Sequence, residues 1–318
     1  MQGEFFLKPN KINVENMCAL SEENSVSYEK RMCEISELCD SLCSGISELS
    51  HQGFGIYEIL GFVSDSVDLT SQRPHSFSLG ENKAGISKYL EMLSAADKAL
   101  FSEMLTEKMK RSGLSFGEAD FLPTGQGEGV VAYVKNRLAD EAYDVFFDSL
   151  PSLKVLYTDS LKSAARLVAK GKAEYCLLPL EEKGGARLAG VAALLFSYDL
   201  KIASVTPVFG FDGSADVKYA LVSSHFSIPK INSDDDRYLE IRVAFDYKES
   251  VSSLFLASEF LGVSLYRINT VKFDTEEGEE SYYTIVFKGE GKDFSAFLVF
   301  LTLFVTSYSA IGIYKNLE

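Results

Sequence analysis

The sequence predicts a multidomain protein of the α/β and α+β classes, and three observations lead to this prediction. The first is an alternation of β-prone and amphipathic helical segments between residues 126 and 231. The second is a βαββαβ order over 237–318, typical of a ferredoxin-like antiparallel sheet with two helices on one face. The third is a pair of turn-rich stretches, 123–129 and 229–236, which have the composition of linkers. We therefore predict a mostly helical N-terminal region over 1–125, a single-lobed α/β domain over 126–231 and a βαββαβ domain over 237–318.

Composition narrows the class of protein. The chain has 318 residues, 46% of them hydrophobic, and a formal net charge of -15. A chain this acidic repels nucleic-acid backbones and anionic lipid surfaces. No segment reaches membrane-spanning length, so we expect a cytoplasmic protein with neither nucleic acid nor membrane as partner. The five cysteines include no pair of CxxC motifs, so we expect reduced thiols, no bound metal and no cofactor.

The N-terminal region contains two helical patterns. Apolar residues recur every three or four positions from Met32 to Leu49, which predicts a helix near 26–50 with Cys39 on its buried stripe. A second helix is predicted from the capping residue Ser94 to Arg111. Residues 83–93 also look helical. Residues 54–63 are β-prone and suggest a strand or hairpin.

The middle region has the order of a parallel sheet with flanking helices, whose ligand crevice lies beyond the carboxyl ends of the strands. Predicted strands are 130–134, 154–157, 174–180 and 201–208; predicted helices are 139–150, 160–170 and 188–198. The candidate ligand cleft consists of residues just past the third strand, a helix-capping serine and a lysine further along: Glu181, Glu182, Lys183, Arg187, Ser160 and Lys218. An ion-pair network on a loop is an equally good interpretation of the charged residues in this set.

The last region contains an unusually apolar helix. Its predicted elements are strand 238–246, helix 250–261, strand 263–273, acidic turn 274–280, strand 281–288, helix 293–305 and strand 308–315. Helix 293–305 is apolar around nearly its whole circumference, so we expect burial on more than one side. We predict a homodimer through residues 237–318 with Phe297, Phe300 and Phe304 as buried anchors. Cover by the N-terminal region of the same chain is the alternative.

Two segments resemble a known family. Residues 171–181 (GKAEYCLLPLE) and 198–202 (YDLKI) resemble the "GxADYGVLPIENS" and "HDLKI" motifs of prephenate dehydratase, and the region after 236 looks like the ACT domain that follows it. The resemblance covers about residues 130–318 and implies a periplasmic-binding-protein-like catalytic fold. It also implies conversion of prephenate to phenylpyruvate in phenylalanine synthesis, with phenylalanine bound by the ACT domain. Residues 1–125 occupy the place of a chorismate mutase, for which Arg31 is the only matching cation.

The functional positions of the family differ in this chain. The amide and hydroxyl residues of "IENS" are Glu182 and Lys183, and the catalytic threonine of "TRF" is Val217, which has no hydroxyl. Only fourteen residues separate Ile202 from Val217, where the family inserts a second lobe. In the effector region, Ser250 and Val251 stand at the last two positions of the family's "PGAL" motif. Asn269 and Thr270 stand at the first two positions of its "ESRP" motif, so the residues of the ACT effector site are altered.

These replacements predict a degenerate relative of the dehydratase, with a regulatory or interaction role and no residue assigned to catalysis. Such a protein could still bind a small carboxylate or an amino acid. An active prephenate dehydratase is the alternative, and a purely structural oligomerisation protein is a third possibility.

Overall fold

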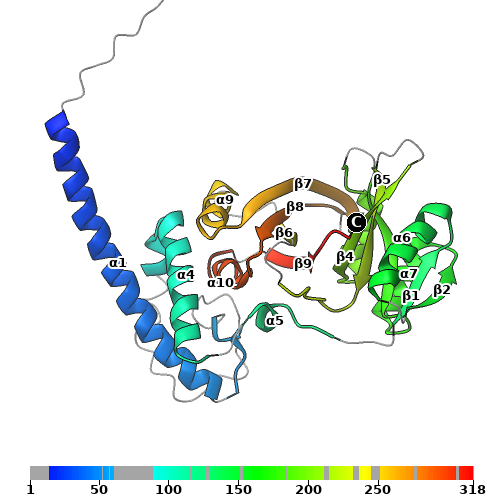
Figure 1. Cartoon of the computed structure of the whole chain (residues 1–318), viewed down its shortest axis with the longest axis horizontal. Helices are drawn as coiled ribbons and strands as arrows, with labels where there is room; N and C mark the ends of the chain where they lie inside the picture. The colour runs from blue at the N-terminus through cyan, green and yellow to red at the C-terminus, as the bar shows by residue number, and fades with distance from the viewer. Residues whose placement is uncertain are drawn as a thin grey trace, which may run out of the picture.

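Figure 1 shows the computed structural model of the chain. The structure describes residues 14–51, 53–56, 58–60, 89–114, 117–125, 129–150, 153–182, 185–210, 215–231, 236–244, 251–275, 278–305 and 308–317. Within these ranges, no helix is both long enough and apolar enough to cross a lipid bilayer.

Two long helices dominate the N-terminal region, α1 (Val14–His51) and α4 (Ala95–Arg111), and the short helix α5 (Glu118–Phe121) follows them. The predicted apolar stripe of α1 is buried from Ile35 to Leu49. α1 begins at Val14, well before the predicted start, because the preceding residues include good helix formers such as Glu, Met, Ala and Leu. The predicted cap of α4 is confirmed, since the hydroxyl of Ser94 accepts the backbone N–H of Asp97 at 3.2 Å. Arg31 forms an ion pair with Asp97 at 3.0 Å.

Cys39 lies in the contact between α1 and α4. Its thiol donates to the carbonyl oxygen of Phe101 at 3.8 Å. Burial, followed by the neighbouring thiol of Cys43, raises the pKa of Cys39 to about 12, so this thiol stays protonated and packs as a small apolar group. The described residues contain no group of three or more His, Cys, Asp or Glu side chains that could hold a metal ion.

The predicted strand or hairpin at 54–63 is wrong. Ile56 and residues 58–60 are helical. Ile56, Ile59 and Leu60 are buried in the same core as α1 and α4, so tertiary packing outweighs their β-propensity. Residues 61–63 lie outside the described residues, and of the predicted helix 83–93 the structure describes a helical segment at 89–92.

The middle of the chain forms an α/β unit. Its elements are β1 (Val130–Val134), α6 (Arg137–Ser149), β2 (Lys154–Thr158), α7 (Leu161–Ala169), β3 (Tyr175–Glu182), α8 (Ala189–Ser197), β4 (Lys201–Phe209) and β5 (Ala215–Ser223). Strands β2, β1 and β3 are parallel, as predicted. The sheet is mixed, however, because β5 lies antiparallel between β3 and β4. The segment that carries Val217 and Lys218 is therefore an inner strand of this sheet.

The C-terminal unit has the predicted βαββαβ order. Its elements are β6 (Asp236–Ala244), α9 (Val251–Phe260), β7 (Ser264–Thr275), β8 (Gly278–Glu290), α10 (Ser295–Phe304) and β9 (Tyr308–Tyr314). Its strands lie in the order β9-β6-β8-β7, and neighbouring strands are antiparallel. The predicted acidic turn 274–280 is too long, because β7 and β8 continue pairing through Asp274 and Glu279 to Thr275 and Gly278. Acidic residues such as Asp274 and Glu279, whose composition is typical of a loop, therefore belong to the paired strands of the hairpin.

The sheets of the two units join edge to edge. β4 pairs in parallel with β9, at Ile202 and Gly312, and the result is one nine-stranded sheet in the order β2-β1-β3-β5-β4-β9-β6-β8-β7. Beyond the strand pairing, Val205 N–H donates to the Lys315 carbonyl at 3.2 Å, and Leu317 N–H donates to the Val205 carbonyl at 2.8 Å. The backbone of the last residues therefore fastens the C-terminal unit to the α/β unit.

Gly312 permits this close junction. A Cβ atom at this position would lie 2.5 Å from the carbonyl oxygen of Ile202 and 2.8 Å from the Ile202 Cβ. We expect Gly312→Ala to push β4 and β9 apart and to lower the free energy of unfolding by about 1–3 kcal/mol, measured by urea denaturation. Hydrogen exchange at Val205 should accelerate. Gly190→Ala is the matched control, because no atom lies within 4 Å of the added methyl group; equal stability of the two variants would contradict the prediction.

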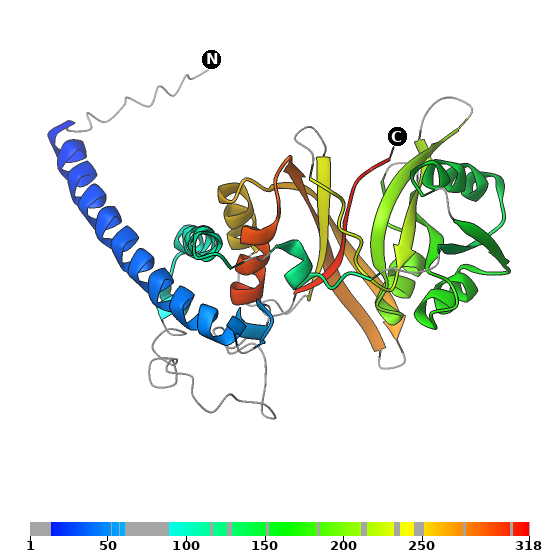
Figure 2. The same cartoon turned by 60° about the horizontal axis from the view of Figure 1, so that its bottom comes forward.

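α10 is covered on all sides within one chain. Every residue of this helix except Ala296 is buried. α4 packs on α9 and α10 on the side away from the sheet, and Figures 1 and 2 both place the C-terminal unit between the N-terminal helices and the α/β unit. Phe101 of α4 contacts Phe304 edge to face at 6.2 Å. The predicted burial of this helix on more than one side is therefore confirmed, and the alternative cover, by the N-terminal region, is the one observed.

The proposed dimer anchors have partners inside the chain. The Phe300 ring stacks on Phe297 and meets Phe304 at a tilt, and the three rings, Phe297, Phe300 and Phe304, are 1%, 0% and 7% exposed in a single chain. These three rings are not available for a second copy in this arrangement. The homodimer itself stays a prediction.

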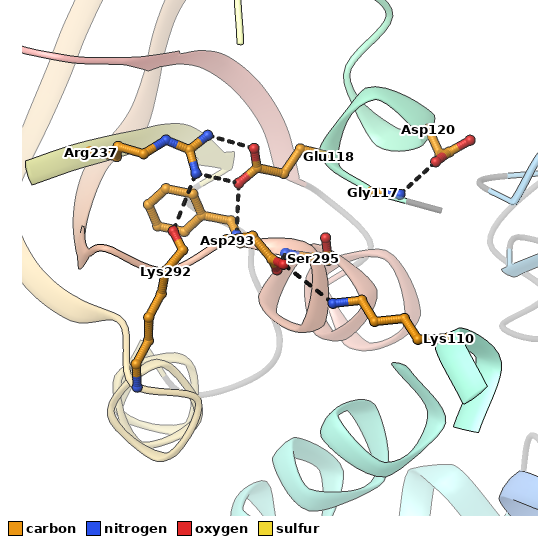
Figure 3. A network of polar contacts seen from close by, with 9 residues as sticks. Lys110, Gly117, Glu118, Asp120, Arg237, Lys292, Asp293 and Ser295 are labelled. Carbon is orange, nitrogen blue, oxygen red and sulfur yellow. Dashed lines mark hydrogen bonds and ion pairs between the residues drawn. The ribbon is translucent and has the colours of Figure 1, made fainter. Parts of the chain in front are cut away.

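A buried ion pair ties α5 to the C-terminal unit (Figure 3). Glu118 receives two hydrogen bonds from Arg237 on β6, at 3.0 and 2.5 Å. The same carboxylate accepts the backbone N–H of Phe294 at 2.8 Å, and Arg237 also donates to the carbonyl of Lys292 at 3.2 Å. Arg237 is 0% exposed and Glu118 6%. This pair, which we call the α5 clasp, holds the segment that leads from the N-terminal helices to β1.

Candidate functional site

Glu181 stands at the carboxyl end of β3, just after an irregularity in the β3–β5 pairing. Its side chain is buried because the C-terminal unit covers it. Arg267 of β7 lies 2.5 Å from Glu181 Oε1, and Lys218 of β5 lies 3.7 Å from Oε2. Arg267 also donates to the carbonyl of Gly185 at 3.2 Å. The carboxylate is therefore held by two cations and does not open into a cleft.

Arg187 extends the same cluster across the junction of the two units. It pairs with Glu181 through a β-bridge and forms an ion pair with Glu240 of β6. Tyr314 of β9 donates to the other oxygen of Glu240 at 2.9 Å. Burial lowers the pKa of Arg187, but Glu240 and its neighbours raise it further, so the group stays charged. Burial and then the Glu240 charge raise the pKa of Tyr314, so this phenol stays neutral and can donate.

The structure brings together three of the predicted cleft residues, Glu181, Arg187 and Lys218. Glu182 is exposed and pairs with Val217 in the β3–β5 ladder, and Lys183 lies outside the described residues. The charged residues form the ion-pair network that was the alternative interpretation. We call Glu181, Arg187, Lys218, Glu240, Arg267 and Tyr314 the interdomain cluster.

Sequence reasoning missed the half of this cluster that the C-terminal strands supply. A charged residue between Leu239 and Ile241 is typical of a strand with one solvent-facing side, and Glu240 becomes buried only because the α/β unit docks on that side. Arg267 and Tyr314 carry no local signal either. Their roles depend on a contact between segments far apart in the chain.

The residues matched to the ACT effector region separate in space. Asn269 shares a face of β7 with Arg267, two residues away, and with Val271, which packs on Ala192 of α8. It therefore faces the α/β unit, while Thr270 is exposed on the opposite face. Val251 begins α9, and Ser250 lies outside the described residues.

Ser160 lies elsewhere, in a cavity of about 310 Å³ at the carboxyl ends of β1, β2 and β3. As predicted, it caps α7, accepting the Ser163 N–H at 3.2 Å. Asn136 caps α6 in the same way at 3.0 Å, and both residues line this strand-end cavity. Two helix N-termini thus border one opening in the position where parallel sheets take ligands.

The strand-end cavity has little acid–base capacity. Two of its described lining residues titrate, Asp159 and Tyr219. A hydrogen bond from Ser163 lowers the pKa of Asp159, which stays ionised. Burial raises the pKa of Tyr219, against a hydrogen bond from Asn136 that lowers it, so the phenol stays neutral. Neither group exchanges a proton near neutral pH, so the cavity is suited to binding through hydrogen bonds and apolar contacts.

Comparisons with known proteins give structural matches. No protein-family model matches the chain, and no curated protein matches it. The chain is similar in structure to prephenate dehydratase from Streptococcus mutans, with 12% identity and a TM-score of 0.48, over 59% of this chain and 99% of that one. It is similar to GqqA, a novel type of quorum quenching acylase, with 16% identity and a TM-score of 0.43, over 59% and 96% of the two chains. It is also similar to prephenate dehydratase from Arthrobacter aurescens in complex with L-Phe, with 13% identity and a TM-score of 0.42, over 58% and 90%.

Proposed function

We propose that the chain is a catalytically silent relative of the prephenate dehydratases, with a regulatory or interaction role in aromatic amino-acid metabolism and an ACT-like domain over 237–318. The observation that carries this proposal is the burial of Glu181 at the end of β3, paired with Arg267 of the C-terminal unit. The "IENS" resemblance begins beside this residue. In this chain, the interdomain cluster joins the α/β unit to the C-terminal unit.

The surroundings of Val217 support the same proposal. Val217 stands at the position of the family's catalytic threonine, pairs with Glu182 on one side and Val208 on the other, and contributes apolar packing in the sheet. A valine neither donates nor accepts a proton. The described hydroxyls of the strand-end cavity belong to Ser160, which caps α7, and to Tyr219, whose pKa is raised by burial, so neither stands at the position of the family's threonine.

The connection between β4 and β5 also argues against catalysis. β4 ends at Phe209 and β5 begins at Ala215, so these neighbouring strands are joined directly where the family inserts a second lobe. β5 pairs with one edge of β4, and β9 pairs with the other. A cleft closed by two lobes, which would exclude water from a substrate, has no second wall from this part of the chain.

Purified protein should form no phenylpyruvate from prephenate above background, in an assay where an active prephenate dehydratase serves as positive control. We also expect Val217→Thr to remain silent, because the restored hydroxyl still lacks the second wall of the cleft. Rates above background in the wild-type chain would reverse the proposal, provided that they disappear in Glu182→Ala. Glu174→Ala, at the opposite end of β3, is the matched control and should leave any such rate unchanged.

We also propose a small-molecule ligand and a homodimeric partner for this chain. A small carboxylate or an amino acid would bind in the strand-end cavity, where the Asn136 amide and the helix ends offer donors and Asp159 offers a negative charge for an ammonium group. A homodimer through 237–318 would use the edge strand β7. Tyr266 and Ile268 of this strand are 44% and 41% exposed.

A further inference from the structure

A small, partly enclosed cavity lies where α8 meets the C-terminal sheet, apart from the strand-end cavity. It has room for about one water molecule. Arg187, Lys201, Arg242, Asp199 and Glu240 are its charged lining residues. Residues of both units form its wall, so anything bound there contacts both of them.

One polar atom at this cavity has no partner. Arg187 is buried, with 4% of its side chain exposed, and it lines the cavity. One of its terminal nitrogens binds Glu240, whereas the other, Nη1, makes no hydrogen bond. Buried unsatisfied donors are rare in folded proteins, and a bound water or ion is a common explanation.

A second guanidinium group faces the same cavity without a carboxylate partner among the described residues. Arg242 lies over the ring of Phe196, 4.3 Å from its centroid, and 5.4 Å from the centroid of Tyr282. Tyr282 lines the cavity together with Arg242 and Arg187. Burial raises the pKa of Tyr282, whereas the charges of Arg242 and Arg187 act to lower it. Aromatic faces stabilise a cation but leave its charge uncompensated.

The charges around the cavity do not balance. Asp199 is bound to Lys201 at 2.6 Å, and Glu240 is bound to Arg187 and Tyr314. On the far side of Arg187, Glu181 is shared between Arg267 and Lys218. Among the described residues that line the cavity, three cations (Arg187, Lys201 and Arg242) therefore face two carboxylates (Asp199 and Glu240), in a chain whose net charge is -15. Arg267, Lys218 and Glu181, which do not line it, add a further excess of one cation.

We infer that this cavity binds a small monovalent anion, chloride by size and charge, between Arg187 and Arg242. The anion would accept the unused N–H of Arg187 and reduce the positive excess. Ser309 and Thr284 also line the cavity and carry hydroxyl donors. A neutral water molecule could accept the same hydrogen bond but would leave the charge uncompensated. Because the wall comes from both units, bound chloride should stabilise their junction.

Thermal unfolding of the full chain tests the inference. The midpoint temperature should rise saturably with sodium chloride and not with sodium gluconate at the same ionic strength. At a chloride concentration ten times the dissociation constant, the folding equilibrium constant should rise about elevenfold. Arg242→Gln should abolish this difference, and Arg242→Lys should keep part of it. Arg166→Gln removes the same charge from an exposed site on α7 and should behave as wild type.

Crystals of the wild-type chain soaked in sodium bromide give a second measurement that does not depend on any variant. We expect an anomalous peak between the guanidinium groups of Arg187 and Arg242. Equal melting curves in chloride and gluconate, with only a water molecule in the cavity, would overturn the inference. A chloride effect that survives in Arg242→Gln would overturn it as well, because the ion would then bind elsewhere.

Discussion

Replacing Arg237 with alanine should lower the free energy of unfolding by about 3–5 kcal/mol. The substitution leaves the buried carboxylate of Glu118 without its bidentate partner, and removal of one member of a buried pair costs far more than the pair itself contributes. Glu118→Ala should cost a similar amount, because it leaves Arg237 unpaired and removes the acceptor of the Phe294 N–H. Urea denaturation followed by far-ultraviolet circular dichroism measures both losses.

A neighbouring exposed pair provides the control. Lys110 and Asp293 lie 3.2 Å apart beside the α5 clasp, with side chains 38% and 36% exposed, so Lys110→Ala should cost about 1 kcal/mol or less. Apolar replacement of both residues, Arg237→Met with Glu118→Leu, should recover part of the loss. It cannot recover all of it, because the Phe294 N–H and the Lys292 carbonyl lose their partners. Equal losses for Lys110→Ala and Arg237→Ala would refute this account of the clasp.

The second large effect is expected at Phe101. This ring is fully buried between the N-terminal helices and the C-terminal unit, touching Phe304 at its side-chain end while its carbonyl accepts the Cys39 thiol. Phe101→Ala should cost about 3–5 kcal/mol through lost burial and the cavity left behind. Urea denaturation measures the loss, and limited proteolysis should show faster cleavage between α4 and α5 as the helices loosen.

Phe147 supplies the matched substitution. It lies on α6 with 38% of its surface exposed and packs on Tyr143, so Phe147→Ala deletes the same atoms with a smaller loss of burial and no enclosed cavity. We expect a loss of about 1 kcal/mol, well below that of Phe101→Ala. If the two phenylalanine variants lost the same stability, α4 would not be the cover that α10 requires.

The parts of the fold that depend on neighbouring residues are predictable from the sequence. Ser94 and Ser160 cap their helices as expected, because a cap requires only a hydroxyl and the next turn. The βαββαβ order also follows from local patterns. Ile56 and residues 58–60 are helical against the sequence-based expectation of a strand. Branched residues such as Ile56 and Ile59 favour strands, whereas contact with α1 and α4 determines their conformation.

The interdomain cluster shows where local reasoning stops. The sequence pointed to three members of this cluster, Glu181, Arg187 and Lys218, because they lie in or beside strands of the α/β unit. Several of their partners belong to strands of the C-terminal unit. Arg187 and Glu240 are 53 residues apart in sequence, and Glu240 and Tyr314 are 74 apart. The pairing of β6 with β9 brings Tyr314 to Glu240, and the junction of the two units along β4 and β9 brings Arg187 to the same carboxylate. No spacing motif encodes a contact between two sheet edges.

The central place of the C-terminal unit has a consequence for synthesis. Residues 236–317 leave the ribosome after both sets of elements that pack on them, so α4 and α8 emerge before their apolar faces have a partner. Contacts of this long sequence separation form late and slowly. A nascent chain halted before β6 would expose the α4 face, the α8 face and the open edge of β4 together, as a target for chaperones and proteases.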